Sequence, residues 1–586
     1  MGAFYLIRNG SEIKESAVLE LFQQKGLREP SVFPLSDYKI CIYNKILPSG
    51  RNYILRDDSS LFAIGSFCYR GKSYEGSLLG ILNDLLSGQF SFEEVQGSFC
   101  FVASIRNEIL LITDRSGIQN LYYDRRCNLL SSSFLAVMVG LSGGIHLNRM
   151  ALLETVATGI MVGPETVADE ILRLDWRDSK SFAFKPIQIL RPPDELDAVR
   201  STQSSFNAQI ENQIERLNAY FERLKPIIAE TGVDTGLSGG FDSRLLFALI
   251  RNTFPKHSAH SHYKNPPDTD LRIAREIAAQ SSITLRTVLV NPPWTLDREA
   301  AERALEGAYY FYDGHIRVNY PWLTEFRTIR YRRELLGEVK TGMNGIGGEQ
   351  FRNRDRIVSN YNSVRNWIRN TMIGSPYRSY FASARAEEAL FDQIRRGLAR
   401  RLGIKGSNID FLGIKRWWNE VWIPFGPGIR NNAENQLSLF FSPFADPLLS
   451  LPAYGNISHL GPSVRFEAEM IRRIAPDLAR IHSSYGYSFD RIPATDRWFS
   501  YVRYGLKRPQ TILRQLSPRH HPALLQGKPD GSQDYATLVG ELLREAYSLE
   551  LPINRKFLDT AEPCFYRMVD LGYFVRQNRQ RIVGIT

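Results

Sequence analysis

The stretch that most constrains the fold is the glycine-rich run Leu237-Ser238-Gly239-Gly240-Phe241-Asp242-Ser243. The residues before it, Gly232 to Leu237, are typical of a short buried strand, and Leu245 to Ile250 after it are typical of a buried helix. Glycines let backbone N–H groups approach an oxyanion, and the N-terminus of the following helix adds partial positive charge. The run therefore predicts a phosphate-binding turn between a strand and a helix.

The polar side chains of this run suit a nucleotide. Ser238 and Ser243 can donate hydroxyl hydrogen bonds, and Asp242 can hold a divalent cation that bridges phosphate oxygens. No lysine follows the glycines, so the run is not a Walker phosphate loop. It is instead similar to the pyrophosphate loop of enzymes that split ATP between its α and β phosphates. The plain alternative is an ordinary turn that binds nothing.

Composition narrows the class of protein. A chain of 586 residues is too long for one core, and two or three domains are expected. The net charge of +11 suits an anionic ligand, but the basic residues occur in scattered pairs, which makes nucleic acid an unlikely partner. Five cysteines without a CxxC pair favour a reducing compartment. The absence of an apolar run of 18 residues favours a soluble, cytoplasmic protein.

The order of expected elements divides the chain at a proline-containing segment. Residues 1–190 are mostly short β runs with turns, which predict a β-rich layered domain, and 191–204 are the expected linker. A long amphipathic helix is expected from about 205 to 229. From 230 to about 350 strands alternate with helices, which predicts a parallel sheet. Beyond 360 the sequence is expected to be mostly helical.

Several motifs together resemble the asparagine synthetase family over nearly the whole chain. Ser238-Gly239-Gly240-Phe241-Asp242-Ser243 matches its ATP motif, Gly345-Ile346-Gly347-Gly348-Glu349 looks like its second glycine-rich loop, and Ser442-Pro443-Phe444-Ala445-Asp446 is similar to its P-F-x-D element. Upstream, Gly97 to Phe101 and Asp114 to Tyr123 look like landmarks of its glutaminase domain. The resemblance implies an α/β protein of two domains. Residues 1–190 would be an αββα sandwich like that of N-terminal-nucleophile hydrolases, and residues 205–586 a PP-loop ATPase domain with a helical extension.

The N-terminal part departs from the family in the residues of glutamine hydrolysis. The family's nucleophile is the thiol of the first residue after Met removal, and here that residue is Gly2. The Asn-Gly-Glu stretch that supports the oxyanion in the family is Ile64-Gly65-Ser66. An isoleucine side chain cannot donate to an oxyanion. A folded but inactive glutaminase-like domain is therefore expected.

In the second part the resemblance implies a site for ATP and Mg²⁺. Asp242 and Glu349 are the expected metal ligands and catalytic groups, although Glu349 could be an ordinary turn carboxylate. A lysine that the family places near the phosphates aligns with Tyr485, so Arg480, or else Arg473, is expected to supply the missing charge. The implied ATP-binding residues are Leu237, Ser238, Gly239, Gly240, Asp242, Ser243, His262, Gly345, Gly347 and Gly348.

The implied reaction is amide formation driven by ATP. A carboxylate attacks the α-phosphorus, pyrophosphate leaves, and an amine then displaces AMP from the acyl group. Ile346 replaces a residue that is acidic in asparagine-forming relatives, so another product is expected, as in the relatives that close β-lactams or lasso-peptide macrolactams. The substrates would be a small-molecule or peptide carboxylate and an amine or ammonia.

Candidate substrate contacts are Tyr309, in an aromatic cluster, and Arg352 and Arg354, directly after the second glycine-rich loop. Core packing is the alternative for the aromatic cluster. Two other functions stay open: a non-catalytic ATP-binding protein and an RNA-modifying enzyme with the same phosphate loop. A homodimer or a partner protein of the same pathway is a further possibility that the sequence leaves open.

Overall fold

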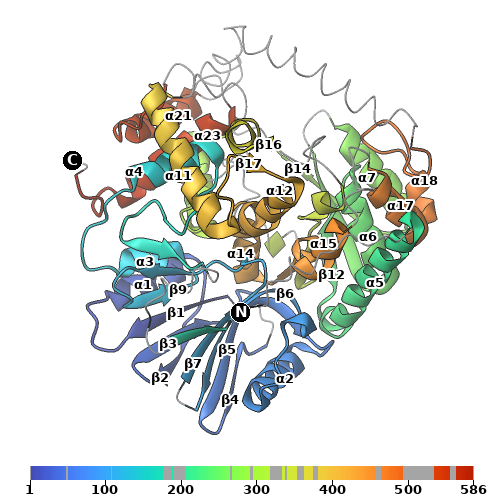
Figure 1. The fold of residues 1–586 in the computed structure, drawn as a ribbon, viewed down its shortest axis with the longest axis horizontal. Coiled ribbons are helices and arrows are strands. Elements are labelled where there is room, and N and C mark those ends of the chain that lie inside the picture. The colour runs from blue at the N-terminus through green and yellow to red at the C-terminus, as the bar shows by residue number, and fades with distance from the viewer. Residues whose placement is uncertain are drawn as a thin grey trace.

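The computed structural model describes residues 2–47, 50–106, 108–175, 184, 187–190, 192, 205–263, 267–290, 295–316, 333–334, 336, 339–352, 362–373, 381–455, 464–492, 533–554 and 562–584. The expected linker 191–204 lies outside these residues apart from Pro192, and so does Arg354. The chain is a mixed α/β protein with two large, mainly antiparallel sheets, one parallel sheet and many helices (Figure 1). A small antiparallel sheet is formed by β16 (Asn362–Ser363) and β17 (Asn408–Ile409).

Two sheets of the N-terminal half pack face to face. The first has the order β10-β8-β9-β1-β3-β2, and the second the order β11-β7-β6-β5-β4. The bounds of the first are β1 Ala3–Arg8, β2 Ser31–Leu35, β3 Tyr38–Tyr43, β8 Tyr122–Asp124, β9 Leu129–Ser131 and β10 Ile171–Arg173. Those of the second are β4 Tyr53–Arg56, β5 Ser59–Tyr69, β6 Val95–Ile105, β7 Glu108–Thr113 and β11 Ile187–Leu190, the last of which runs parallel to β7.

Strand β1 shows why these strands are apolar on both faces. Phe4 and Leu6 lie in the buried layer between the two sheets, together with Phe62 of the second sheet. Tyr5 and Ile7 point the other way, into a cluster with α1 and α3. Because successive side chains of a strand alternate between faces, a continuous apolar run fits a strand that is covered on both sides.

Helices cover the outer faces of the two sheets. Helices α1 (Glu15–Gln24) and α3 (Phe134–Gly140) pack on the first sheet. Helices α2 (Tyr74–Ser87) and α5 (Phe206–Thr231) share a buried cluster with strand β5 of the second sheet. The result is the layered, β-rich arrangement that the sequence predicts for this half, seen at the bottom of Figure 1.

The third sheet is fully parallel, as predicted, with the order β14-β13-β12-β15-β18. Its strands are β12 Val233–Gly236, β13 His257–Tyr263, β14 Leu285–Leu289, β15 Thr341–Met343 and β18 Leu439–Phe441. The first strand in sequence, β12, is central. The chain proceeds outward on one side to β13 and β14, then returns to the other side of β12 for β15 and β18. In such sheets the strand order reverses beside the first strand in sequence. Ligands bind at this point, outside the carboxyl ends of the strands.

Strand β18 lies in the part of the chain beyond residue 360, where the described elements are mostly helical, as predicted. Leu439 and Phe441 are buried in the same cluster as Met343 of β15. Three residues give too short a pattern to separate a buried strand from a buried helix. The longer expected elements lie where predicted, among them helix α4 (Arg149–Thr158), helix α5 and helix α6 (Phe241–Thr253).

The other helices complete the fold. They are α7 Thr269–Gln280, α8 Arg298–Phe311, α10 Val364–Trp367, α11 Ala384–Leu402, α12 Phe411–Trp417, α13 Ile423–Phe425, α14 Pro427–Leu437, α15 Pro447–Tyr454, α17 Arg465–Ile474, α18 Pro476–Arg480, α21 Gln533–Tyr547 and α23 Glu562–Asn578. Helices α11 and α23 pack against α4 of the N-terminal half, and α21 packs on α23 and α8 (Figure 1).

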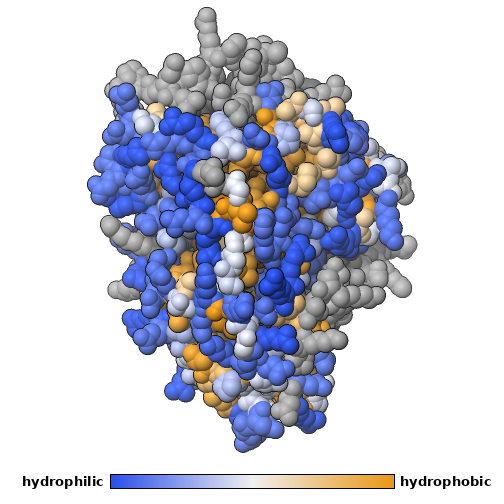
Figure 2. Space-filling view, turned by 90° about the vertical axis from the view of Figure 1, so that its left-hand side faces the viewer, coloured by the Kyte–Doolittle hydropathy of each residue, from blue (hydrophilic) through white to orange (hydrophobic). Residues whose placement is uncertain are grey.

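The two halves share buried clusters. One cluster contains Phe67 and Phe101 of the second sheet together with Leu245 of α6 and Phe441 of β18. The division of the chain into units 1–190 and 205–586 stays a prediction. One face of the surface is mainly hydrophilic, with apolar residues in scattered patches (Figure 2). None of the described helices has the length and apolar character of a transmembrane span.

Candidate functional site

The predicted phosphate turn lies between β12 and α6. Hydrogen bonds of two serines within the turn stabilise its shape. Gly240 is the N-cap of α6. The Ser238 and Ser243 hydroxyls are 2.8 Å apart, and Ser238 Oγ accepts the Gly240 N–H at 3.3 Å. The Ser238 N–H donates to Ser243 Oγ at 3.2 Å. The two serines therefore shape the turn, and α6 begins directly behind it.

The amide of Gly239 already binds a carboxylate. Its N–H donates to Oδ1 of Asp270 in the first turn of α7, at 3.0 Å. A Cβ at this position would lie 2.8 Å from Ile273 and 2.9 Å from the same Asp270 oxygen, so only glycine fits. The N-cap of α7 is Asp268, which accepts the Leu271 N–H at 2.9 Å.

The two glycine-rich loops meet at Asp242. They follow the neighbouring strands β12 and β15, so both lie at the carboxyl edge of the sheet. A Cβ on Gly348 would lie 2.3 Å from Asp242 Oδ1, and one on Gly345 would lie 3.1 Å from the Asp242 carbonyl oxygen. Gly347, with φ +95°, would bring a Cβ within 2.4 Å of the Phe444 carbonyl oxygen. The two glycine-rich loops and the segment Pro443–Ala445 are thus packed together.

An arginine links Asp242 to a second carboxylate that the sequence did not single out. Arg352 donates to Asp242 Oδ2 at 3.0 Å and to Oε2 of Glu467, in α17, at 2.7 Å. The Glu467 side chain is fully buried. The remaining oxygens, Asp242 Oδ1 and Glu467 Oε1, are buried and have no hydrogen-bond partner. Sequence reasoning expected Arg352 to contact substrate, and the structure places it between these two carboxylates.

The electrostatics of this network follow from its burial. Burial raises the pKa of Glu467 well above its usual value; Arg352 opposes the shift, and the nearby Asp242 and Glu349 charges add to it. Burial lowers the pKa of Arg352, but Glu467 and Asp242 outweigh this effect and the pKa is raised overall. Arg352 is therefore a permanent cation among three acidic groups.

The acidic groups fit a metal bound together with phosphate. Among the described residues no group of three or more His, Cys, Asp and Glu side chains is arranged to hold a metal by itself. Magnesium on a nucleotide needs only one or two carboxylates, because phosphates and water supply its other ligands. Asp242 Oδ1 is a buried oxygen without a donor, and Glu349 is half-buried and close enough to act on both Arg352 and Glu467. These two side chains could hold the ion.

Tyr485, which the resemblance aligns with a lysine of the asparagine synthetase family, lies beside the predicted phosphate turn. Its ring centroid is 5.0 Å from that of Phe241, and the Ser484 N–H donates to the Gly239 carbonyl at 3.3 Å. Burial raises the Tyr485 pKa; the neighbouring Arg352 lowers it, and the nearby Asp242 raises it further. Tyr485 is therefore part of the site, although it cannot supply the charge of a lysine.

Arg244 positions the segment that carries Tyr485. It is fully buried in α6 and donates to the carbonyls of Leu478, Ile481 and His482, at 3.1, 2.7 and 3.0 Å. Burial lowers its pKa to about 10. Sequence reasoning missed this role, although a charged residue at the head of an apolar helical run was a signal that could have indicated it.

Other predicted residues lie in different places. His262 is near the carboxyl end of β13, at the same edge as the phosphate turn, and its ring centroid is 5.2 Å from that of His260. The Leu237 side chain is buried in the core. Arg480 is exposed at the end of α18, and Arg473 pairs with Glu211 of α5 at 3.0 Å. The cation at Asp242 is Arg352, whereas sequence reasoning expected Arg480 or Arg473.

Tyr309 corrects the prediction of a substrate contact. Its hydroxyl accepts the Asn578 side-chain N–H at 2.9 Å, and its ring packs on Tyr573, 5.7 Å between centroids. Both partners belong to α23, and burial raises the Tyr309 pKa. The residue is part of the core between α8 and α23, the alternative given for the aromatic cluster.

The position of the family's thiol nucleophile has no room for a side chain. A Cβ on Gly2 would lie 2.6 Å from the Asn44 carbonyl oxygen and 2.7 Å from Leu27 Cδ2. Ile64 is buried between the two sheets. Ser66 accepts the Phe440 N–H at 2.8 Å and so joins the second sheet to the parallel one.

The P-F-x-D element also joins the halves. Asp446 accepts the Gly97 N–H at 3.2 Å and the Tyr220 hydroxyl at 3.0 Å.

No protein-family model matches this chain, and no curated protein matches its sequence. Its membership of the asparagine synthetase family therefore stays a prediction drawn from the motifs.

Proposed function

We propose that this chain is an ATP-dependent amide-bond synthetase that forms AMP and pyrophosphate and has no glutaminase activity of its own. The observation that carries the proposal is the contact of Asp242 with Gly345 and Gly348 at the carboxyl edge of the parallel sheet. A carboxylate held between two glycine-rich loops at the N-terminus of a helix suits a nucleotide and its metal ion.

Different residues of the site would bind the phosphates and the metal ion of ATP. Phosphate oxygens would accept hydrogen bonds from the amides of Gly239 and Gly240 and from the N-terminus of α6. The hydrogen bond from the Gly239 N–H to Asp270 would break when phosphate binds. Asp242 and Glu349 would hold Mg²⁺, which neutralises the charge of the departing pyrophosphate. Arg352 supplies the positive charge that the family carries on a lysine at the position of Tyr485.

The reaction needs a carboxylate and an amine from outside the chain. The carboxylate attacks the α-phosphorus and expels pyrophosphate; the amine then attacks the acyl carbon, AMP leaves and the amine loses a proton. Since Gly2 offers neither a thiol nor space for one, the amine is free ammonia or part of a second substrate. Peptide cyclisation and amidation of a sugar acid are both reactions of a carboxylate with an amine that fit this proposal.

The finer fold assignment belongs to the same proposal. The layered N-terminal half is a degenerate glutaminase-like sandwich of the N-terminal-nucleophile hydrolase type, and the parallel sheet with its helices is a PP-loop ATPase unit. The central position of β12 in the order β14-β13-β12-β15-β18 supports the second assignment. We place the activity in the cytoplasm.

Isotope exchange between pyrophosphate and ATP tests the proposal. With a panel of amino-acid, peptide and uronic-acid carboxylates, at least one acid should support exchange, and Asp242→Asn should abolish it. Asp477→Asn is the matched control and should exchange normally. It removes a carboxylate of α18 that pairs with Arg251 of α6. Exchange that survives in Asp242→Asn would overturn the assignment of this carboxylate.

A non-catalytic ATP-binding protein is the second candidate. Two observations favour it: Arg352 already neutralises Asp242, and an aromatic residue replaces the family's lysine. ATP binding without exchange for any acid would support it. An RNA-thiolating enzyme is disfavoured, because all five cysteines are buried and sulfur transfer needs an accessible thiol.

A further inference from the structure

The carboxylate of Asp270 occupies the place where the proposed site would hold a phosphate oxygen. Asp270 lies in the first turn of α7, and its Oδ1 accepts the Gly239 N–H of the phosphate turn at 3.0 Å. Carboxylate and phosphate oxygens are both anionic acceptors of hydrogen bonds from backbone N–H groups. The amide of the turn therefore already binds an anionic group of the chain itself.

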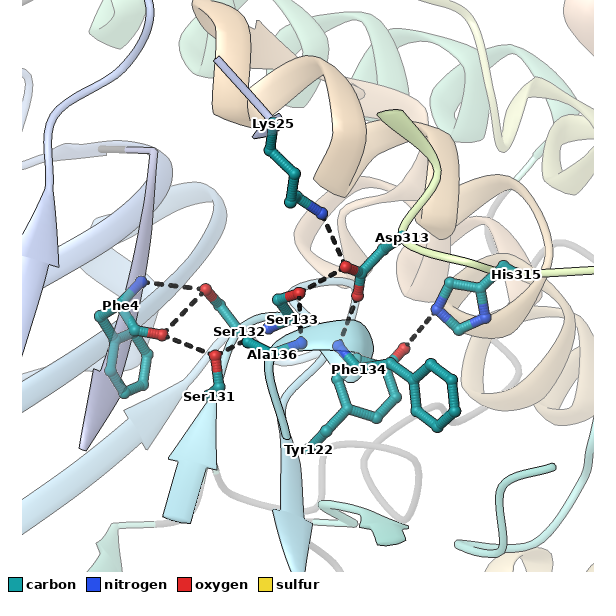
Figure 3. A network of polar contacts seen from close by, with 10 residues as sticks. All are labelled: Phe4, Lys25, Tyr122, Ser131, Ser132, Ser133, Phe134, Ala136, Asp313 and His315. Carbon is teal, nitrogen blue, oxygen red and sulfur yellow. Dashed lines mark hydrogen bonds and ion pairs between the residues drawn. The ribbon is translucent and has the colours of Figure 1, made fainter. Parts of the chain in front are cut away.

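This contact differs from that of a carboxylate with a structural role. Asp313 accepts hydrogen bonds from Lys25, from the Ser133 hydroxyl and from the Phe134 N–H, so a cation and two further donors hold it (Figure 3). By contrast, Asp270 is half-buried and accepts one hydrogen bond, from the turn amide, and it forms no ion pair with the described residues. A carboxylate held by one neutral donor is displaced more readily than one held by a cation.

The two carboxylates near the turn differ in how their charge is compensated. Asp242 pairs with Arg352 at 3.0 Å, whereas Asp270 has no such cation among the described residues. Burial gives the largest rise in the pKa of Tyr485, and Arg352 lowers it. The carboxylates of Asp242 and Asp270 raise the same pKa further, so both act on the space at the Tyr485 hydroxyl. An anion bound at the turn would therefore meet the uncompensated charge of Asp270.

A ligand that binds the Gly239 N–H has to displace Asp270 and then remains beside it. The first turn of a helix has N–H groups without partners within the helix, and these stabilise a nearby carboxylate. The displaced side chain can therefore stay at the N-terminus of α7, close to the ligand. A metal-free polyphosphate keeps its full negative charge there, whereas bound Mg²⁺ cancels part of it. Asp270 therefore repels the metal-free ligand more strongly.

We infer that Asp270 is a specificity-determining residue of the proposed site. Its carboxylate competes with phosphate for the Gly239 N–H and, by repulsion, selects magnesium-bound nucleotide over metal-free anions. The inference rests on the proposed function, because it requires that phosphate binds at this turn. It goes beyond that function in assigning the selection of the ligand to a side chain that holds neither the metal nor the phosphate.

Isothermal titration calorimetry on the full-length protein tests the inference with two probes, inorganic pyrophosphate in metal-free buffer and ATP with excess Mg²⁺. Asp270→Asn removes the charge and keeps the shape, so the side-chain oxygen can still accept the Gly239 N–H. The affinity for metal-free pyrophosphate should rise about tenfold, because one like charge is lost near the ligand. The affinity for Mg·ATP should rise about threefold or less, because the metal already reduces the repulsion.

Asp268→Asn is the matched control. It removes a carboxylate from the same end of α7, but Asp268 is exposed and caps the helix, a role that asparagine fills equally well. Both affinities should stay within about twofold of those of the wild type, since an exposed charge is screened by solvent and salt. If the contact of Asp270 is only structural, Asp270→Asn should lower the melting temperature and leave both affinities unchanged or weaker.

Two further variants keep the test decisive if Asp270→Asn does not fold. Asp270→Ser has a shorter, neutral side chain that leaves the Gly239 N–H open, so it should give the same gain for pyrophosphate. Asp270→Glu keeps the negative charge in the first turn of the helix, where an acidic residue is favourable. It should bind pyrophosphate as weakly as the wild type does.

The outcomes separate the inference from the proposed function. A gain for pyrophosphate in Asp270→Asn or Asp270→Ser that exceeds the gain for Mg·ATP supports both. If the wild type binds Mg·ATP, the inference is overturned by any of three results: no gain for pyrophosphate, an equal gain for the two probes, or the same gain in Asp268→Asn. The proposed function then stands. If neither the wild type nor any variant binds either probe, the proposed function is overturned as well.

Discussion

Arg352 and Asp242 form an ion pair of 3.0 Å at the junction of the two glycine-rich loops, and the same arginine binds the buried Glu467 at 2.7 Å. This pairing explains how a carboxylate at the N-terminus of α6 can sit beside two other acidic groups without being repelled. It also gives the site a permanent cation.

Removing this cation should destabilise the protein. Arg352→Met leaves two buried or half-buried carboxylates facing each other, and the free energy of unfolding should fall by about 3 kcal/mol. Adding Glu467→Gln should recover part of the loss, since less uncompensated charge remains. Urea unfolding of the single and double variants measures both effects. As the control, Arg473→Met breaks two more exposed ion pairs, with Glu211 and Glu469, and should cost no more than about 1 kcal/mol. A double variant less stable than the single one would contradict this account.

The glycines of the second loop should be intolerant of a side chain. Gly348→Ala would place a Cβ 2.3 Å from Asp242 Oδ1, so the carboxylate must move and Mg²⁺-dependent ATP binding should weaken. Gly540→Ala is the control, because that glycine lies within α21 with nothing within 4 Å of its Cβ position. It should stabilise the protein by up to about 1 kcal/mol, through helix propensity. Equal ATP affinity in wild type and Gly348→Ala would show that Asp242 is not fixed by this contact.

The N-terminal half should release no ammonia from glutamine. Restoring the family's nucleophile by Gly2→Cys should not create the activity, because the new Cβ would clash with Asn44 and Leu27 and lower the melting temperature. A coupled assay for glutamate and ammonia measures the activity, and thermal unfolding measures the clash. Glutamine hydrolysis above the buffer rate by either protein would be incompatible with the closed position of Gly2.

Glu154 should make the stability depend on pH. Burial raises its pKa in the folded state to about 7, whereas the unfolded chain has an ordinary glutamate. Between these values the folded state holds a proton that the unfolded state has lost, so stability falls as pH rises from about 4.5 to about 7. The expected contribution of this group to the free energy of unfolding is about 3 kcal/mol. Glu154→Gln keeps the acceptor for Val162 and should flatten this part of the stability profile in urea unfolding. If the stability of Glu154→Gln depends on pH as steeply as that of the wild type, another group causes this dependence.

Local sequence patterns predicted the parts of the fold that depend on neighbours in the chain. The turn at Gly239 and Gly240 and the helix that follows could both be predicted from adjacent residues. The apolar runs of β1 and β6 also predicted strands, because their burial on both faces leaves a continuous pattern.

The missed features depend on contacts between distant parts of the chain. Glu467 and Arg352 are 115 residues apart, and nothing in the sequence around Glu467 indicates that its helix turns toward Asp242. Arg244 likewise acts on carbonyls more than 200 residues away. Tyr309 was misassigned because an aromatic cluster has the same composition whether it faces a substrate or, as here, the core beside α23.

The measurement that tests the central claim most directly is calorimetric titration of the protein with ATP, with and without Mg²⁺, for wild type and Asp242→Asn. The account predicts that wild type binds ATP when Mg²⁺ is present, and that removing either the metal or the carboxylate lowers the affinity by at least about tenfold. If Asp242→Asn binds Mg·ATP as tightly as wild type, or if the affinity is the same in the presence of a chelator, the nucleotide does not lie where the two glycine-rich loops meet.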